Sequence, residues 1–484
     1  MSTSTRTVIF VLGALLAALG IAMLIPAIID LHADAQSAHA FFGSAVVCGF
    51  IGGVMMLMGQ GGRYDLDARG AILVTSGSWI VLGLAAAIPL HLAGIGMSWT
   101  DAIFESVSGI TTTGATVLTG LRDLPEGILI WRAILQWIGG IGIIVTAMAI
   151  WPVLGIGGMQ LFRLESSDKV DKALPRAGEI AGAVGLIYLV LTFACFLAYG
   201  FAGMNAFDAA AHAMTTVATG GFSTDDGSIG AWAEEGADLV ALVFMLLSAL
   251  PFLVYLRAVQ GRPDRILSDP QVRTFLAVAA FVCVLLTALL MLNDVETGGL
   301  PAWRAAAVNA VSVITGTGYG SADFAAWGTA PVMIMFILMF LGGCAGSSTC
   351  SIKMFRHQIA ASAMLTYLHR YARPRAVRSV HYDGKPVPEA TVRSVLGFVF
   401  LFFAAFIGAS IALSLIGLDP VTALSGAAST IANVGPGLGE TIGPAGTYQP
   451  LPDAAKWVMS FTMLVGRLEV LTMLALFTPA FWRS

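Results

Sequence analysis

Long apolar stretches dominate the chain, and short polar ones separate them. Because about 20 apolar residues cross the hydrocarbon core as a helix, the pattern predicts ten spanning helices. Their approximate ranges are 7–29, 40–59, 70–93, 128–154, 179–202, 237–259, 272–293, 330–368, 391–417 and 454–478. The eighth is too long for one plain span and carries GGCAGSSTC in its middle, so we expect it to be broken.

Four further segments lie between these helices, and each is too short and too polar to span. They are WTDAIFESVSGITTTGATV (99–117), NAFDAAAHAMTTVATGGFS (205–223), PAWRAAAVNAVSVITGTGYG (301–320) and DPVTALSGAASTIANVGPGLG (419–439). Each opens with a helix-start signal; these signals are Asp101, Asn205, Pro301 and the pair Asp419–Pro420. Each continues for about three helical turns and then stops at a small polar stretch. Aligning the glycines of these stretches matches Gly114, Gly220, Gly318 and Gly435.

This repetition predicts the fold class. We expect an all-α polytopic membrane protein with four pseudo-symmetric helix–re-entrant pore loop–helix repeats around one pore, plus an extra N-terminal helical hairpin. The hairpin is expected to cover 1–69. The expected repeats are 70–178, 179–271, 272–390 with an intramembrane gating loop, and 391–484.

Composition and charge agree with a membrane protein. Of the 484 residues, 57% are hydrophobic and 11% are charged, against about 25% charged in soluble domains. The net charge of −4 argues against a nucleic-acid partner. Twenty of the 25 Lys and Arg residues fall on the side of the N-terminus and four on the other side, where Arg132 is placed at the outer interface. This bias predicts a cytoplasmic N-terminus.

The four loops have the residue types of an ion filter. Irregular backbone at membrane depth is tolerated where it is buried in protein or lines water. Glycine permits positive φ, so successive carbonyls can face one axis and replace the water shell of a monovalent cation. The residues before the aligned glycines, Thr113, Thr219, Thr317 and Val434, are expected to pack outward and stiffen each turn. The candidate filter residues are Thr112, Thr113, Gly114, Ala218, Thr219, Gly220, Gly316, Thr317, Gly318, Asn433, Val434 and Gly435. One such loop alone carries little weight, because glycines in membrane helices more often serve close packing.

The sequence resembles the TrkH/TrkG-type potassium uptake proteins of the Trk/Ktr/HKT superfamily over nearly its whole length. The resemblance rests on QWIGGIGIIVTAMAI (136–150), LGIGGMQLFRLESSD (154–168), the four loops, GGCAGSSTCSIK (342–353) and MLVGRLEVLTML (463–474). It implies that the four aligned glycines are the filter glycines. It also implies potassium as the transported ion, because serine at the first of these positions accompanies sodium conduction in the family.

The resemblance also implies a location and partners. It places the chain in the bacterial inner membrane, in contact with membrane lipids, as a homodimer without an organic cofactor of its own. The basic segment 353–393 would help dock a cytosolic nucleotide-binding regulator of the TrkA type, although the positive-inside rule alone accounts for its charge. The chain has no Walker or Rossmann fingerprint of its own, so nucleotide control would come from that regulator.

Arg467 and the stretch 342–353 are the candidate gate. An arginine near the centre of a span costs roughly 2.5–3.5 kcal/mol, so Arg467 is expected to face a water-filled interior and oppose cation passage. The alternative is a buried pairing with a carboxylate, for which Glu469 is badly placed on the same helix. The gate residues are Gly342, Gly343, Cys344, Ala345, Gly346, Ser347, Ser348, Thr349, Lys353 and Arg467.

Each part of the candidate gate has a second interpretation. The small residues of 342–351 also suit tight helix packing, and Lys353 also suits an interfacial lysine that reaches toward water. Cys350 and Ser351 stand where the family commonly has a Gly-Gly pair, which bears on the flexibility of the loop.

The membrane potential is sufficient to drive uptake. It is worth about 2.3 kcal/mol per charge per 100 mV, so coupling to another ion is not required. No relay of Asp, Glu and His stands out within the spans, and His212 is expected to be structural. We therefore predict gated, selective, potential-driven permeation of potassium. Three alternatives remain open: potassium symport with protons or sodium, a broken-helix secondary transporter of another solute, and a membrane enzyme, which the lack of clustered catalytic residues disfavours.

Overall fold

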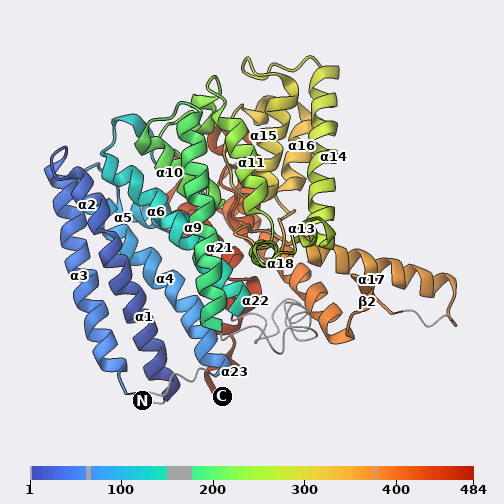
Figure 1. Cartoon of the computed structure of the whole chain (residues 1–484), viewed down its shortest axis with the longest axis horizontal. Helices are drawn as coiled ribbons and strands as arrows, with labels where there is room; N and C mark the ends of the chain where they lie inside the picture. Colours follow the sequence, from blue (N-terminus) through green and yellow to red (C-terminus); the bar gives the residue numbers. More distant parts are fainter. Residues whose placement is uncertain (1–2, 62–66, 150–176, 376–378, 484) are drawn as a thin grey trace.

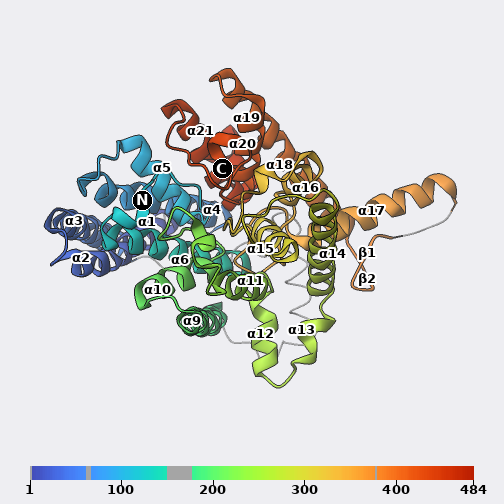
Figure 2. The same ribbon diagram turned by 90° about the horizontal axis from the view of Figure 1, so that it is seen from above.

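The structure is a computed structural model that describes residues 3–61, 67–149, 177–375 and 379–483. Its N-terminal part is a helical hairpin of α1 (Thr3–Ala22), α2 (Leu24–Asp30) and α3 (Ala35–Gly59). The two long helices touch through small residues, since a Cβ on Gly52 would lie 2.6 Å from the carbonyl oxygen of Gly13. The hairpin lies at one edge of the molecule (Figure 2), as the sequence predicts for an element added to the repeats.

Four units of helix, half-helix and helix surround a common centre (Figure 2). The first two comprise α4 (Ala68–Leu92), α5 (Trp99–Ile110) and α6 (Glu126–Ala149), then α9 (Ala177–Phe201), α10 (Ala206–Val217), α11 (Ala237–Ser248) and α12 (Phe252–Val259). The last two comprise α14 (Pro270–Leu292), α15 (Ala302–Thr315) and α16 (Thr329–Leu338), then α18 (Glu389–Leu415), α19 (Pro420–Ala432), α21 (Asp453–Arg467) and α22 (Val470–Leu476). The predicted fold class is confirmed, whereas the residue boundaries of the repeats stay a prediction.

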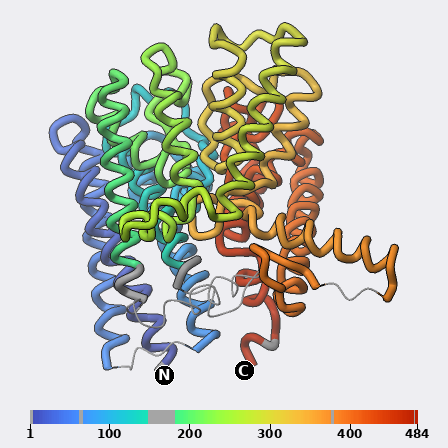
Figure 3. The backbone as a smooth tube through the Cα atoms, turned by 45° about the vertical axis from the view of Figure 1, so that its right-hand side comes forward, coloured from blue at the N-terminus to red at the C-terminus, as the bar shows by residue number. Residues whose placement is uncertain are grey.

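Connecting elements complete the described chain. They are η1 (Leu121–Asp123), η3 (Ser228–Trp232), α13 (Asp264–Ser268), η4 (Phe324–Ala326), α17 (Met354–Ala372), β1 (His381–Tyr382), β2 (Lys385–Pro386), α20 (Gly439–Ile442) and α23 (Pro479–Arg483). The two strands pair antiparallel. Helix α17 projects away from the body, and both termini lie on the same side of the molecule (Figure 1). Figure 3 shows α12 and α13 running across the long helices rather than along them.

Three of the ten expected spans are sharply bent or interrupted by irregular chain. Seven helices in the described residues are long and apolar enough to cross a membrane. The span expected at 237–259 bends by 86° between α11 and α12, and the one expected at 454–478 bends by 114° between α21 and α22. The span expected at 330–368 is broken as predicted, with irregular chain between α16 and α17. The end of the span expected at 128–154 lies outside the described residues.

The half-helices begin where the sequence indicates, with one exception. Asn205, Pro301 and Asp419 are the N-caps of α10, α15 and α19. Asp101 was expected to begin α5, which is wrong, because the N-cap is Ser98. The Ser98 hydroxyl accepts from the backbone N–H of Asp101 at 3.1 Å and donates to its carboxylate at 2.8 Å. Asp101 therefore completes a reciprocal cap from the first turn.

Candidate filter and gate

The four loops share one backbone pattern after their half-helices. In each loop a middle residue donates its N–H to the carbonyl oxygen five residues earlier. These bonds are Thr113 to Ser108 at 2.8 Å, Gly220 to Thr215 at 2.8 Å, Thr317 to Ser312 at 2.8 Å and Val434 to Ser429 at 2.9 Å. The residues before the middle residues have positive φ: Thr112 (52°), Thr219 (53°), Gly316 (70°) and Asn433 (53°). The residues after them are glycines with positive φ, here called the ring glycines: Gly114 (82°), Gly221 (76°), Gly318 (81°) and Gly435 (111°).

This pattern corrects the alignment of the second loop by one residue. Gly220 was matched to Gly114, Gly318 and Gly435, but the backbone makes Gly221 their equivalent. Gly220 is the middle residue, so it occupies the place of Thr113, Thr317 and Val434. Thr219 consequently does not stiffen the turn as predicted, and its hydroxyl donates to the carbonyl oxygen of Ala218 at 2.7 Å.

The loops meet each other in cyclic order. An added Cβ on each ring glycine would lie against the carbonyl oxygen of the middle residue in the next loop. The distances are 2.2 Å from Gly114 to Gly220, 1.8 Å from Gly221 to Thr317, 2.0 Å from Gly318 to Val434 and 2.8 Å from Gly435 to Thr113. Four segments far apart in the sequence thus bring their middle carbonyl oxygens into one ring. Only glycine fits beside each of these oxygens, for reasons of space as well as of backbone conformation.

Side chains behind the ring hold the loops in place. The hydroxyls of Thr111 and Thr113 bond at 2.7 Å, and those of Thr315 and Thr317 at 2.8 Å. In the fourth loop, the carbonyl oxygen of Gly435 accepts from the hydroxyls of Ser429 and Tyr448, both at 2.8 Å; these bonds are among the structural supports that sequence reasoning missed.

A buried ion pair connects the first two loops. Arg132 on α6 bonds Glu105 on α5 at 2.7 Å, and neither side chain is accessible. Glu105 accepts from the N–H of Val117, and Arg132 donates to the carbonyl oxygen of Ser223. Arg132, expected at the outer interface, is buried inside the protein, and its depth in the membrane stays a prediction. The sequence contains a signal for this ion pair, because Arg132 is a charge inside an apolar stretch and a buried charge needs a partner.

His212 has both ring nitrogens occupied, as a structural residue would. Nδ1 is 2.8 Å from the carbonyl oxygen of Asp208, and Nε2 is 3.0 Å from the hydroxyl of Ser223. Its ring also packs edge-on against Trp232. These contacts support the structural interpretation of His212 made from the sequence.

The chain between α16 and α17, residues 339–353, forms a buried loop that we call the gate loop. It is fixed to the bend between α11 and α12, because Cys344 N–H donates to Ala249 O, and Phe252 N–H to Gly346 O, both at 3.0 Å. Gln271 of α14 accepts from the N–H of Ala345 at 2.9 Å. The Cys350 sulfur lies 3.7 Å from the hydroxyl of Thr112 in the first filter loop. The gate loop therefore packs directly against the filter loops.

Arg467 differs from its predicted environment. It is the last residue of α21 rather than the middle of a straight helix, and it is 2% exposed rather than facing open water. Its guanidinium donates to the carbonyl oxygens of Ser348 at 3.3 Å and Gly139 at 3.1 Å and contacts the Cys350 sulfur. Within the described residues no carboxylate is within salt-bridge distance of it. Arg467 thus joins the gate loop to α6.

The neighbouring charges form a separate pair. Glu469, which has a φ of 60° at the break after α21, bonds Arg356 of α17 at 2.5 Å. The prediction that Glu469 is a poor partner for Arg467 is therefore confirmed. Lys353 is 4% exposed, and its ammonium has no hydrogen-bond partner among the described residues. The alternative interpretation of Lys353 as an interfacial lysine that reaches toward water does not match this burial.

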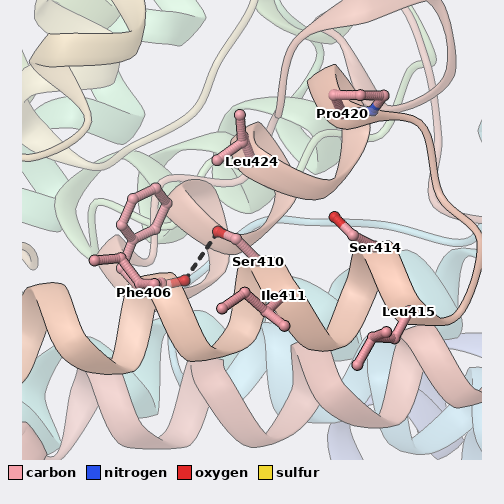
Figure 4. A pocket seen from close by; sticks show the side chains of 8 residues that line it. Phe406, Ser410, Ile411, Ser414, Leu415, Pro420 and Leu424 are labelled. Atoms are coloured by element: carbon pink, nitrogen blue, oxygen red, sulfur yellow. Dashed lines mark hydrogen bonds between the residues drawn. The ribbon is translucent and has the colours of Figure 1, made fainter.

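A groove of about 410 Å³ lies elsewhere, between α18 and the half-helix α19. Figure 4 shows its lining, which includes Phe406, Ser410 and Leu424. The Ser410 hydroxyl donates a hydrogen bond to the carbonyl oxygen of Phe406 at 2.9 Å. The groove is almost wholly apolar and belongs to the outer face of the fourth unit rather than to the ring.

Comparisons with known proteins agree on one family. The profile of the TrkH family, described as cation transport protein, matches residues 37–484. The Trk system potassium uptake protein TrkI of Halomonas elongata is 46% identical over 416 residues, covering 85% of this chain and 84% of its own. TrkH of Vibrio parahaemolyticus is 39% identical over 99% of both sequences. The crystal structure of the potassium transporter TrkH from Vibrio parahaemolyticus has a TM-score of 0.91, with 36% identity, and covers 99% of this chain and 100% of that one.

Proposed function

Because the chain belongs to the TrkH family of cation transport proteins, we propose that it carries potassium ions into the cell through the ring of the four loops. It is a multi-pass membrane protein and a transporter rather than an enzyme. The relatives at 33–46% identity are named potassium uptake proteins, which supports potassium as the cargo. The observation that carries the proposal is the cyclic contact between ring glycines and middle carbonyl oxygens.

The ring suits a dehydrated monovalent cation. Carbonyl oxygens replace the water shell of an ion without adding net charge, so the ion can enter and also leave. The middle residues of the ring are three uncharged side chains and a glycine, which is the wrong chemistry for a divalent ion. The filter function of Thr112 to Gly114, Ala218 to Gly220, Gly316 to Gly318 and Asn433 to Gly435 is therefore part of the proposal, with Gly221 added to it.

The gate loop and Arg467 would control passage below the ring. The loop packs beneath Thr112, and the guanidinium adds a buried positive charge beside it. A cation leaving the ring meets this charge, which opposes it strongly in a medium of low dielectric constant. Movement of 342–353, with Lys353 at its end, would open the path.

The orientation and partners belong to the same proposal. The chain lies in the bacterial inner membrane with its N-terminus in the cytoplasm, and the distribution of Lys and Arg supports this orientation. Two copies form a homodimer surrounded by membrane lipids. A cytosolic nucleotide-binding regulator of the TrkA type docks on the basic segment 353–393, whose helix α17 projects from the body (Figure 1).

Purified protein in liposomes tests the proposal. We expect current or tracer flux whose reversal potential follows the potassium gradient and ignores the sodium and proton gradients. A reversal potential that shifts with pH or sodium at fixed potassium would indicate symport instead. Saturable uptake of an organic solute with indifference to potassium would indicate a secondary transporter and contradict the proposal.

A further inference from the structure

Gln136 of α6 holds the second filter loop at two points. Its side-chain amide donates from Nε2 to the carbonyl oxygen of Gly220 at 2.6 Å. Its Oε1 accepts from the backbone N–H of Phe222 at 3.0 Å. The side chain is completely buried, so both ends of the amide are used by backbone on either side of the ring glycine Gly221.

This contact makes the ring asymmetric. The four middle carbonyl oxygens belong to Thr113, Gly220, Thr317 and Val434. In the described parts of the chain, only that of Gly220 accepts a hydrogen bond from a side chain. A carbonyl oxygen has two lone pairs, so one remains for an ion.

The fourth unit has a different residue at the position that corresponds to Gln136. A Cβ on Gly139 of α6 would lie 1.9 Å from the carbonyl oxygen of Ile110, and one on Gly466 of α21 would lie 1.9 Å from that of Ile431. Both isoleucines come three residues before their middle residue, so α6 and α21 meet their half-helices in the same register. Gln136 lies three residues before Gly139, and Met463 lies three residues before Gly466, so these two residues occupy equivalent positions. Methionine cannot donate to a carbonyl oxygen.

The sequence of the second loop explains why it needs such a support. Its middle residue is glycine, where the other loops have threonine or valine. A β-branched residue restricts the backbone beside it, whereas two successive glycines leave it free. Gln136 supplies from outside the restraint that the missing side chain would supply from within. Since selectivity depends on the position and field of the carbonyl oxygens, loosening one of the four alters the preference between ions.

We infer that Gln136 is a positioning residue that sets the preference for potassium over sodium by fixing the carbonyl oxygen of Gly220. The inference rests on the proposed filter function. It assigns to one side chain of α6 an effect on selectivity, in addition to the packing that any buried side chain contributes.

The test is Gln136→Met, which places in α6 the residue type that α21 carries at the equivalent position. The variant is reconstituted in liposomes, and the reversal potential is measured with potassium and sodium on opposite sides. We expect the potassium-to-sodium permeability ratio to fall by roughly tenfold, the size of effect that the loss of one or two net hydrogen bonds supports. The permeability ratio is independent of how much protein folds, so a purely structural role would leave it unchanged.

The matched control is Gln358→Met on α17. Gln358 also donates twice, to Pro270 O at 3.0 Å and to the hydroxyl of Thr274 at 2.6 Å, but it touches no filter loop. We expect its permeability ratio to equal that of the unchanged protein. If Gln136→Met does not fold, Gln136→Leu removes both the donor for Gly220 and the acceptor for Phe222 without adding a charge or a new donor, and we expect the same loss of preference.

The possible outcomes distinguish the inference about Gln136 from the proposed function. An unchanged permeability ratio in a folded Gln136 variant overturns the inference and leaves the proposed function intact. An equal loss in Gln358→Met also overturns it, because the effect would then be general. If the unchanged protein itself shows no preference for potassium, the proposed function fails, independently of Gln136.

Discussion

At the scale of single residues, Gly220 and Gly221 are adjacent but have different environments. Gly221 has a φ of 76°, and a Cβ there would lie 1.8 Å from the carbonyl oxygen of Thr317. A Cβ on Gly220 would instead meet the end of the Gln136 side chain, which would have to give up its two bonds to the loop but is not itself part of the ring. We expect Gly221→Ala to abolish selective flux and Gly220→Ala to retain part of it, because an L residue at positive φ costs roughly 1–2 kcal/mol before any clash.

Flux and reversal potential of the two alanine variants, reconstituted side by side, check this order. If Gly220→Ala lost more selective flux than Gly221→Ala, Gly220 would again be the equivalent of Gly114, Gly318 and Gly435, as the sequence predicts. The sequence could place the second loop but not its register, because ATGG offers two adjacent glycines and the residue types do not distinguish them. The hydrogen bond from the Gly220 N–H to the Thr215 carbonyl decides the register, and that bond leaves no trace in the residue types.

Arg467 combines a charge with two hydrogen bonds, and substitutions can separate these. Arg467→Ala removes both, so we expect a higher basal cation flux at equal protein. Arg467→Lys keeps the charge but replaces the two guanidinium nitrogens that reach Ser348 and Gly139 with a single ammonium, so we expect an intermediate flux. Arg265→Ala, on the exposed helix α13, is the control. Flux in Arg467→Ala at or below that of the unchanged protein would reject the barrier role.

At the scale of elements, the gate loop is a separate piece of chain fixed by several weak attachments. Removing 345–350 eliminates the bonds to Gln271, Ser248 and Phe252 and the carbonyl that Arg467 reaches. We expect the deletion to leave a leaky pore that conducts when the chain is reconstituted alone. Gln271→Leu, which removes only the acceptor for Ala345, should raise basal flux less. A folded deletion variant that stays closed would mean that the segment only packs the helices together.

The breaks in the helices show where sequence patterns stop being informative. The gate loop was predictable, because GGCAGSSTC changes both the composition and the expected length of a span. The 114° bend after Arg467 was not, because LEVLTML continues the apolar pattern across it. Hydropathy indicates how apolar the surroundings of a segment are, but it carries no information about the direction in which the helix axis runs. The bend is visible only in the structure, in the φ of Glu469 and its bond to Arg356.

At the scale of the whole molecule, the N-terminal hairpin is attached to the ring units by a buried carboxylate. Asp30 at the end of α2 accepts from the N–H of Gly127 at 2.7 Å, in the first turn of α6. An acidic side chain at a helix N-terminus typically contributes about 1 kcal/mol. We therefore expect Asp30→Ala to lower the thermal unfolding temperature in detergent while the permeability ratio stays unchanged. Asp34→Ala, which removes the cap of α3 within the hairpin, is the comparison. A changed ion preference in Asp30→Ala would show that the hairpin acts on the filter.

At the ring the four units meet through their backbone, so an ion bound there should stabilise the whole molecule. A ligand that binds only the folded state adds RT ln(1 + [L]/Kd), which is about 2.7 kcal/mol at a concentration of 100 Kd. We expect the unfolding temperature to rise with potassium concentration, less with sodium, and not at all with choline at the same ionic strength. Gly221→Ala should abolish the difference between potassium and choline, because its Cβ occupies the space beside the Thr317 carbonyl oxygen. Equal stabilisation by all three cations would mean that the effect is one of general ionic strength, and the four loops would then have no shared ion site.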